Sequence, residues 1–324
     1  MSPSGEGKMQ IQNKSFDLKD LSLIIPCFNS ESYLANNVIE IINELNRNFS
    51  LNFEILLVVD GSPDKTIQIA QQLAANYSEI RAIELTKNFG QHAALFAGIS
   101  QAHGNLIITL DDDGQHTPAG ISELLSSLKP EFDVVYGIAE KEEHNFLRNL
   151  LSILAKQIIF RVLGIRNARH ISAFRLVRHE ILRNIDFTNL SRGTLDVVIH
   201  WNTSRISWVK VKVLKRPHGK SNYRLRGLIH FGLDMITNYS TAPLRLASFI
   251  GAIGFVTSCG LAFYFGAMSL SGNITVPGFA SLSILITALG SIQLMSLGIL
   301  GEYLSKIHEK SSSRPTFTIR ETWN

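Results

Sequence analysis

The chain has 324 residues, of which 45% are hydrophobic and 18% charged, enough for one or two domains with a sizeable core. Its two cysteines, Cys27 and Cys259, lie far apart, which argues against a disulfide framework and suits a reducing compartment. The formal net charge of +4 is modest, but the positive residues are clustered. The polar segment 1–20 lacks the apolar stretch of a secretory signal and is expected to be a loose tail.

The first part of the chain is predicted to alternate strands with helices. Short apolar runs predict strands at 21–25, 54–59, 80–85, 106–110 and 133–137. Helices are expected at about 33–49, 66–77 and 118–128, with another after the loop 88–92. This alternation predicts a mostly parallel sheet with helices on both faces, and ligand-binding positions at the carboxyl ends of the strands.

Three consecutive acids, Asp111, Asp112 and Asp113, follow the fourth predicted strand. Because strand residues alternate between faces, Asp111 and Asp113 can share a direction while Asp112 points elsewhere. Gln115 is next in phase, and such oxygen ligands suit Mg²⁺ or Mn²⁺, especially when a diphosphate supplies further oxygens. An acidic loop that caps the next helix is the alternative. Asp60, at a second strand end, favours the ligand site.

Two stretches of the chain are strongly basic. Between 148 and 183 there are eight Lys and Arg residues and the single acid Glu180, mixed with a dense apolar pattern. This predicts a helix at a membrane surface, with a core helix that has a solvated basic face as the alternative; the apolar content argues against nucleic-acid binding. Between 205 and 226 there are eight more and no acid, in a stretch that spans a half-buried strand (206–214) and the start of an amphipathic helix (223–239).

The last part of the chain predicts a membrane hairpin. Residues 246–270 and 279–300 are uncharged, and runs of about 20 such residues can cross a bilayer core of roughly 30 Å. Arg245 precedes the pair and Lys306 follows it, so the positive-inside rule places both ends in the cytoplasm. A buried helical hairpin in a soluble domain is the alternative.

Several ordered motifs carry a resemblance to a known family. Segments 25–31, 59–64 and 110–116 resemble the three signature segments of family 2 glycosyltransferases. Further segments are similar to the polyprenyl-phosphate glycosyltransferases, which include dolichol-phosphate mannose synthases and bacterial undecaprenyl-phosphate glucosyl and aminoarabinosyl transferases: 88–94, 173–176, 220–223, 241–245, 301–304 and 314–315. The resemblance extends from about 21 to 320, and the two-helix C-terminus resembles the bacterial members.

The resemblance implies a GT-A-like (Rossmann-like) α/β fold followed by interface helices and a transmembrane hairpin. It also implies an inverting enzyme that moves a sugar from a nucleotide-sugar, expected to be a UDP-sugar, to a polyprenyl phosphate, expected to be undecaprenyl phosphate. The product would be a lipid-linked sugar for cell-surface glycan modification, made at the cytoplasmic side of a bacterial inner membrane. A homo-oligomer is left open.

Site residues follow from the resemblance one by one. The catalytic residues would be Asp111, Asp113 and Arg175, and the ligands of Mg²⁺ or Mn²⁺ would be Asp111, Asp113 and Gln115. The donor nucleotide would be bound by Pro26, Phe28, Glu31, Asp60, Gly61, Ser62 and Asp112. The acceptor phosphate would be bound by Arg148, Arg161, Ser172, Arg175 and Lys220.

The implied organisation has five parts. They are a tail (1–20), a GT-A-like catalytic domain (21–222) with its acceptor-site segment from about 144, a juxtamembrane helix (223–243), two transmembrane helices (244–301) and a cytoplasmic tail (302–324).

Three departures from the family pattern leave the donor open. The paired Asp before Gly-Ser is here Val59-Asp60, Asp-x-Asp-Leu-Gln reads Asp-Asp-Asp-Gly-Gln at 111–115, and 171–173 lacks the usual acid and glycine. Two rival functions also remain. A processive polysaccharide synthase usually has a Gln-x-x-Arg-Trp segment, which is absent, and the altered acidic motifs keep open an inactive, membrane-anchored nucleotide-binding scaffold.

Overall fold

A computed structural model gives the structure of the chain. It describes residues 20–49, 51–140, 170–188, 190, 194–214, 247, 249–250, 253, 256, 260, 263, 279–311 and 315–324. The chain divides into two compact units. The first comprises residues 1–157, 165–222 and 314–324, and the second comprises 158–164 and 223–313.

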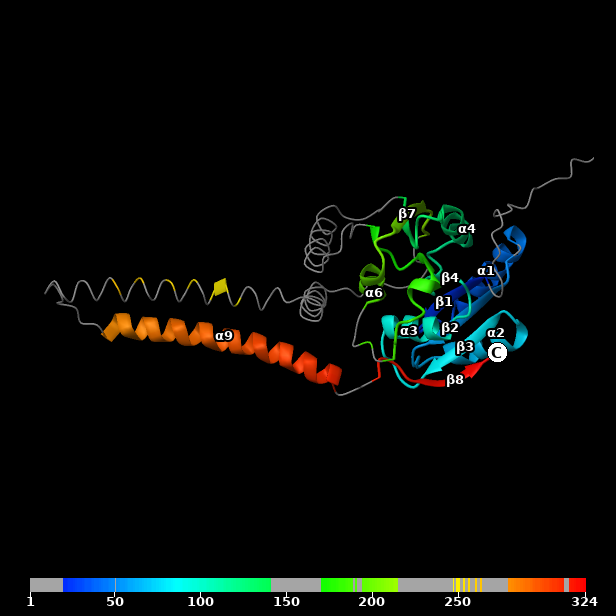
Figure 1. The fold of residues 1–324 in the computed structure, drawn as a ribbon. Helices are drawn as coiled ribbons and strands as arrows, with labels where there is room; N and C mark the ends of the chain where they lie inside the picture. Colours follow the sequence, from blue (N-terminus) through cyan, green and yellow to red (C-terminus); the bar gives the residue numbers. More distant parts are fainter. Residues whose placement is uncertain are drawn as a thin grey trace, which may run out of the picture. The chain divides into compact units, whose positions relative to one another are not determined.

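The first unit contains an eight-stranded sheet with the strand order β7-β5-β6-β4-β1-β2-β3-β8 (Figure 1). Its strands are β1 (Leu21–Cys27), β2 (Phe53–Val59), β3 (Ile80–Leu85), β4 (Leu106–Thr109), β5 (Val134–Ala139), β6 (Arg175–Arg178), β7 (Ile206–Val211) and β8 (Ile319–Trp323). The pairs β1–β2, β1–β4, β2–β3 and β5–β7 are parallel. Strands β6 and β8 run antiparallel to their neighbours, so the sheet is mixed but mostly parallel, as the alternation predicts.

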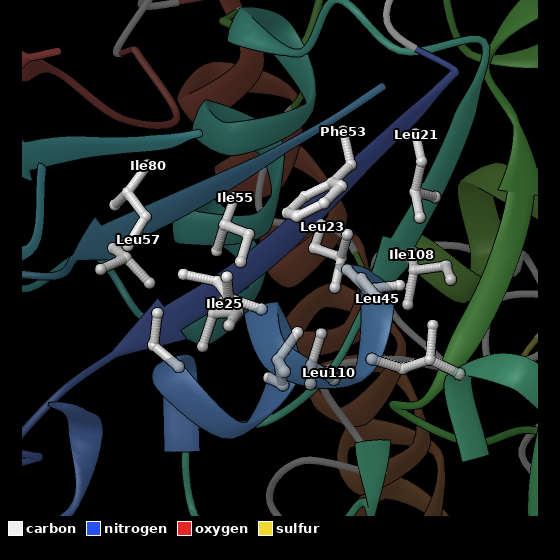
Figure 2. Close-up of a cluster of buried hydrophobic side chains, with 14 of the residues drawn as sticks. Leu21, Leu23, Ile25, Leu45, Phe53, Ile55, Leu57, Ile80, Ile108 and Leu110 are labelled. Carbon is white, nitrogen blue, oxygen red and sulfur yellow. The ribbon is translucent and has the colours of Figure 1, made fainter. Parts of the chain in front are cut away.

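Helices cover both faces of this sheet. They are α1 (Leu34–Asn48), α2 (Thr66–Asn76), α3 (Gln91–Gln101), α4 (Pro118–Ser127) and α6 (Leu195–Asn202), with a short 3₁₀ helix η2 (His179–Ile181). Because successive strand residues point to opposite faces, Leu23 and Ile25 pack in a cluster with α1, α2 and α4, whereas Ile24 packs in a second cluster with α3 and α6. Figure 2 shows the first cluster, in which side chains from β1, β2 and α1 meet.

The local sequence explains two of these helices. In α1 the buried residues recur at helical spacing and form one apolar face toward the core, as in other amphipathic helices: Leu34, Val38, Ile41, Ile42 and Leu45. Helix α4 begins with Pro118, whose fixed φ suits the first turn, and the Thr117 hydroxyl accepts the Gly120 N–H over 3.3 Å. These two helices pack on the face of the sheet that carries the first cluster.

Besides the short η2, three elements of the first unit have no counterpart in the sequence expectations. The segment at Arg175–Arg178, which the motif assigns to the acceptor site, forms the interior strand β6 between β4 and β5. Helix α6 precedes β7, and β8 adds an edge strand beside β3. The predicted tail 302–324 is thus divided between a helix of the second unit and a strand of the first.

In the second unit the structure describes α9 (Phe279–Ser311) and scattered helical residues from 247 to 263. Among the described residues, no helix combines the length and the hydrophobicity that a membrane crossing requires. The predicted span 246–270 lies mostly outside these residues, and so do the predicted surface helix before 170 and the juxtamembrane helix 223–243.

Candidate active site

An open cleft of about 370 Å³ lies where the carboxyl ends of β1, β2 and β4 meet. Carboxyl ends of parallel strands are the usual ligand site of open α/β sheets. The lining residues come from the end of β1 and the loop after it, the residue before α1, the residue after β2, the loop before α3 with the first residue of α3, and the loop after β4: Pro26, Cys27, Phe28, Tyr33, Asp60, Asn88, Gly90, Gln91, Asp111, Asp112 and Asp113.

Asp112 holds the loop after β1 in place. Its carboxylate accepts the Ser30 hydroxyl and the Phe28 backbone N–H, the latter over 3.2 Å. Burial raises the pKa of Asp112 to about 6, although these two hydrogen bonds oppose the rise and the charges of Asp111 and Asp113 add to it. Asp112 therefore lines the cleft while its carboxylate is engaged with the protein itself.

The two flanking acids have different partners. The Gln91 side-chain amide donates to Asp111 Oδ1 over 2.6 Å, and the Gln115 backbone N–H donates to Asp113 Oδ1 over 3.1 Å. Both Asp111 and Asp113 line the cleft, but Gln115 does not, and its side-chain amide donates to the Leu214 carbonyl oxygen over 3.3 Å. The structure thus brings two of the three predicted metal ligands to the cleft.

The carboxylate of Asp60 fixes the loop before α3. Its two oxygens accept the backbone N–H groups of Phe89, over 2.7 Å, and Gly90, over 2.8 Å. Burial raises the pKa of Asp60, and the two hydrogen bonds partly offset that rise. Asp60 is 3% exposed, so at this cleft it acts first as a support for the Asn88–Gly90 wall.

Three other predicted donor-site residues, Glu31, Gly61 and Ser62, lie outside the lining of the cleft. Ser62 Oγ donates to Asp64 over 2.6 Å and accepts the Asn29 N–H over 2.8 Å, and the Glu31 carboxylate accepts the Lys65 N–H over 3.0 Å. Burial by itself raises the pKa of Asp64, but hydrogen bonds from Ser62 and Thr66 outweigh it and lower the pKa. These contacts join the loop after β1 to the start of α2.

Gly61 is required by a close approach of two loops. Its φ is +58°, and a Cβ at this position would lie 2.4 Å from the Lys87 carbonyl carbon and 2.5 Å from the Asn88 nitrogen. A side chain would therefore meet both backbone strain and a steric clash. The contact sets the loop that follows β2 against the loop that follows β3.

Arg175 lies in a buried polar network and does not line the cleft. It is 2% exposed, and its guanidinium forms an ion pair with Asp196 of α6. The Tyr136 hydroxyl donates to the same Asp196 oxygen over 3.0 Å, and the guanidinium carbon lies 5.8 Å from the centre of the Tyr136 ring. His92, next to the cleft residue Gln91, has its pKa lowered to about 4, first by burial and secondarily by Arg175, whereas Asp196 opposes the shift.

Three of the five predicted acceptor-site residues cannot be placed relative to the cleft. Arg148, Arg161 and Lys220 lie outside the described residues. The Ser172 hydroxyl accepts the Phe174 backbone N–H over 3.2 Å and does not line the cleft. The acceptor roles of these residues and of Arg175 stay predictions.

The residues present fit a divalent cation shared with a phosphate-bearing ligand. Among the described residues no group of three or more His, Cys, Asp or Glu side chains converges as a metal cluster. Asp111 and Asp113, two of the four aspartates that line the cleft, would supply part of an oxygen shell and the diphosphate the rest. Mg²⁺ in nucleotide sites is usually held in this way.

Sequence reasoning did not assign five of the lining residues: Cys27, Tyr33, Asn88, Gly90 and Gln91. The signal for three of them was present, because the loop 88–92 follows a predicted strand and precedes a predicted helix. Asp196 was also missed, since only the sheet order brings the start of α6 to Arg175.

A mostly parallel sheet with an acidic cleft at its strand ends defines an α/β domain whose ligand site lies at the carboxyl edge of the sheet. The model of the family "Glycosyl transferase family 2" matches residues 22–186, and the chain belongs to this family. It is accordingly a glycosyltransferase.

Similar proteins match nearly the whole chain. An undecaprenyl-phosphate 4-deoxy-4-formamido-L-arabinose transferase of Pectobacterium atrosepticum is 31% identical over 316 residues, which cover 94% of each chain. An uncharacterized glycosyltransferase of Synechocystis sp. is 29% identical over 308 residues, which cover 94% of this chain and 96% of that one. Glucosyl-3-phosphoglycerate synthase from Mycobacterium tuberculosis, a solved structure, is 19% identical with a TM-score of 0.49, covering 68% of this chain and 78% of that one.

Proposed function

We propose that this protein is a membrane-bound inverting glycosyltransferase that moves a sugar from a UDP-sugar to undecaprenyl phosphate. The product is a lipid-linked sugar for the modification of a cell-surface glycan at the bacterial inner membrane. The observation that carries the proposal is the acidic cleft, with Asp111 and Asp113 in its lining, in a family 2 chain. Relatives named as undecaprenyl-phosphate sugar transferases, similar over 94% of the chain, support the acceptor.

The donor is proposed to lie in the cleft with its base beside Phe28. This side chain is 43% exposed and lines the cleft, so it offers an aromatic face on which a base can stack. Asp60 holds the Asn88–Gly90 wall against the same space. Asp111 and Asp113 would hold Mg²⁺ or Mn²⁺, which when bound would neutralise the charge that develops on the leaving diphosphate.

The reaction is proposed to be a direct displacement. A phosphate oxygen of the lipid attacks the anomeric carbon, the bond from that carbon to the diphosphate breaks, and the nucleoside diphosphate leaves with the bonding electrons. A phosphate monoester is largely ionised at neutral pH, because its second pKa is about 6, so the attacking oxygen requires little help from a base. The protein's main contribution is then to position two anions against their mutual repulsion.

Membrane attachment is part of the proposal and is supported by the sequence and by exposed apolar side chains of the second unit. Residues 279–300 carry no charge. On α9 the side chains of Leu282, Ile286 and Leu297 are 59%, 62% and 64% exposed. A row of exposed large apolar side chains calls for an apolar partner, which a bilayer would supply. The catalytic domain would then face the cytoplasm.

Two hydrogen bonds to Asp112 favour an active enzyme over an inactive scaffold. The extra acid in the altered motif, Asp112, is engaged with Ser30 and Phe28 and so contributes to the structure of the loop. The departure from the family pattern therefore does not by itself remove the acids at the cleft. No observation favours a polymer-forming enzyme, and the assay below would identify one by its product.

The test is a transfer assay with the full chain in membranes, undecaprenyl phosphate, Mn²⁺ and labelled UDP- and GDP-sugars. We expect label to move into the organic phase with one donor, and Asp113→Asn to abolish this. Glu131→Gln is the matched control, because Glu131 is exposed and precedes β5, away from the cleft. Near-normal activity of Asp113→Asn would overturn the metal assignment. Label in a water-soluble polymer would identify a synthase, and nucleotide binding without transfer would identify a scaffold.

A further inference from the structure

The last strand of the chain lies beside the strand that leads into the donor cleft. Strand β8 pairs antiparallel with β3, with Ala82 opposite Trp323 and Leu85 opposite Ile319 (Figure 1). The pairing continues past the end of β3, since the Thr86 N–H donates to the Thr318 carbonyl oxygen over 2.9 Å. Beyond Thr86 the chain enters the loop whose residues Asn88, Gly90 and Gln91 line the cleft.

A β-bulge places one side chain of β8 at this junction. The register shifts between Glu84, which is opposite Glu321, and Leu85, so Arg320 is the extra residue of β8. Bulges often redirect a side chain next to a functional site. Here the guanidinium donates to Glu84 Oε1 over 3.1 Å and to the Thr86 carbonyl oxygen over 3.0 Å. Arg320 thus contacts both the end of β3 and the first residue of the loop.

The segment before β8 is also anchored in the first unit. The Thr316 N–H donates to the Thr188 carbonyl oxygen over 2.8 Å, and the Thr316 hydroxyl donates to the Leu190 carbonyl oxygen. Phe317 is buried in the second hydrophobic cluster, against which Phe89 of the cleft loop also packs. The strand is therefore held at both ends and is not a loose tail.

The loop 86–91 is fixed from three directions. Asp60 accepts the N–H groups of Phe89 and Gly90, and Gly61 lies against the backbone of residues 87 and 88. Gln91 donates to Asp111. The contacts from β2 and β4 hold the middle and the end of the loop, whereas its beginning depends on β8 and Arg320.

We infer that β8 positions the donor-site loop 86–91 and that Arg320 is a positioning residue for donor binding. The inference rests on the proposed function and deepens it, because it makes nucleotide affinity depend on the C-terminal strand. Only seven residues, 312–318, separate α9 from β8. The chain segment that follows the proposed membrane helix is thereby part of the frame that supports the donor cleft.

Arg320→Ala is the central variant, studied in the full chain in detergent or nanodiscs. Loss of two hydrogen bonds at the start of the loop should weaken UDP binding in the presence of Mn²⁺ by about three- to tenfold. Backbone hydrogen exchange of residues 86–91 should be faster by a similar factor, because local opening of the loop costs less free energy without these hydrogen bonds. In the transfer assay the KM for the donor should rise while kcat changes by less than about twofold. Arg320→Lys retains the charge but loses the planar fork, so its UDP affinity should lie between those of the wild type and Arg320→Ala.

Glu321→Ala is the matched control, because Glu321 is an exposed neighbour of Arg320 on the same strand. It should leave UDP binding and loop exchange unchanged. Unchanged UDP binding and unchanged exchange in Arg320→Ala would overturn the inference. A lower kcat together with a lower thermal midpoint, without a selective rise in the donor KM, would also overturn it. Such a result would show that Arg320 only stabilises the fold. UDP binding and exchange are measured without sugar transfer, so this result is separate from a failure of the proposed reaction.

Discussion

Gln91 donates its side-chain amide to Asp111 Oδ1 over 2.6 Å and so joins the first residue of α3 to the acidic loop after β4. Both residues line the cleft, and the donor-site loop 86–91 ends at this contact. The hydrogen bond fixes one carboxylate oxygen of Asp111. Because the carboxylate is rigid and planar, this also limits the direction of the other oxygen. The orientation of a proposed metal ligand therefore depends on a neutral residue from another element.

Replacing Gln91 with Ala should lower kcat/KM for sugar transfer by roughly tenfold, because a hydrogen bond to a charged group is lost. Gln91→Glu should be more damaging, since it replaces a donor with a carboxylate that repels Asp111 and displaces this proposed ligand, which changes the Mn²⁺ concentration needed for half-maximal activity. Steady-state kinetics over a metal titration measure both effects. Gln101→Ala, at the last residue of α3, is the control and should behave as the wild type. An unaltered metal requirement in Gln91→Glu would contradict this role.

The buried pair of Arg175 and Asp196 can be tested by removing one partner or both. Asp196→Ala leaves an uncompensated guanidinium in the interior, so it should lower the free energy of unfolding by roughly 3–5 kcal/mol. The double variant Arg175→Met with Asp196→Leu should recover most of that loss, because no charge remains buried. Denaturant unfolding midpoints with their slopes measure the difference.

The same double variant separates two roles of Arg175. If the side chain only supports the fold, transfer activity returns together with stability. If it binds the acceptor phosphate, as the motif predicts, stability returns while the KM for undecaprenyl phosphate stays high. A double variant that is as unstable as Asp196→Ala would contradict the account of a buried charge.

Two glycines at the cleft distinguish a steric clash from backbone strain. Gly61→Ala meets both, because its Cβ would lie 2.4 Å from Lys87 and its φ is +58°. Gly90 has a φ of +97°, but a Cβ there would have no neighbour within 4 Å. A non-glycine residue in such a conformation costs about 1–3 kcal/mol. We expect Gly61→Ala to lower the unfolding midpoint and UDP affinity more than Gly90→Ala does, and equal effects would show that the loop contact is unimportant.

In EDTA, Asp112 and His92 should make opposed pH-dependent contributions to the stability of the protein. The pKa of Asp112 is raised from 3.8 to about 6, so the folded state holds its proton more tightly than the unfolded state. Its contribution is fully present below about pH 4 and is lost as pH rises through about 6. The pKa of His92 is lowered from 6.5 to about 4, so its contribution is present above pH 6.5 and is lost as pH falls through about 4.

Single variants should expose each contribution. Asp112→Asn removes the fall in stability between pH 4 and 6. The stability of this variant should therefore rise more steeply with pH over that range than the stability of the wild type does. His92→Asn removes the rise over pH 4 to 6.5 and should give the opposite change of slope. Thermal midpoints at intervals of half a pH unit measure both, and parallel profiles for the two variants and the wild type would refute the assignment.

Strand and helix positions in the first unit were largely predictable because their signals are local. The run 80–85 has the bounds of β3, and the runs 54–59 and 106–110 differ from β2 and β4 by one residue each. Strand β6 was not predicted because a four-residue strand, Arg175–Arg178, stands among motif residues. Strand β8 was not predicted because an exposed edge strand with the sequence IRETW has little apolar pattern, and its pairing joins residues far apart in the chain.

The sequence by itself determined the alternation of strands and helices, the acids at two strand ends and the resemblance to family 2, because periodicity and motif order are properties of neighbouring residues. Only the tertiary structure decided what each polar side chain contacts. It turned Asp112 toward Ser30, gave both oxygens of Asp60 to the loop before α3, and buried Arg175 against Asp196. These choices follow from the sheet order, which brings together segments far apart in the chain, and no local pattern encodes that order.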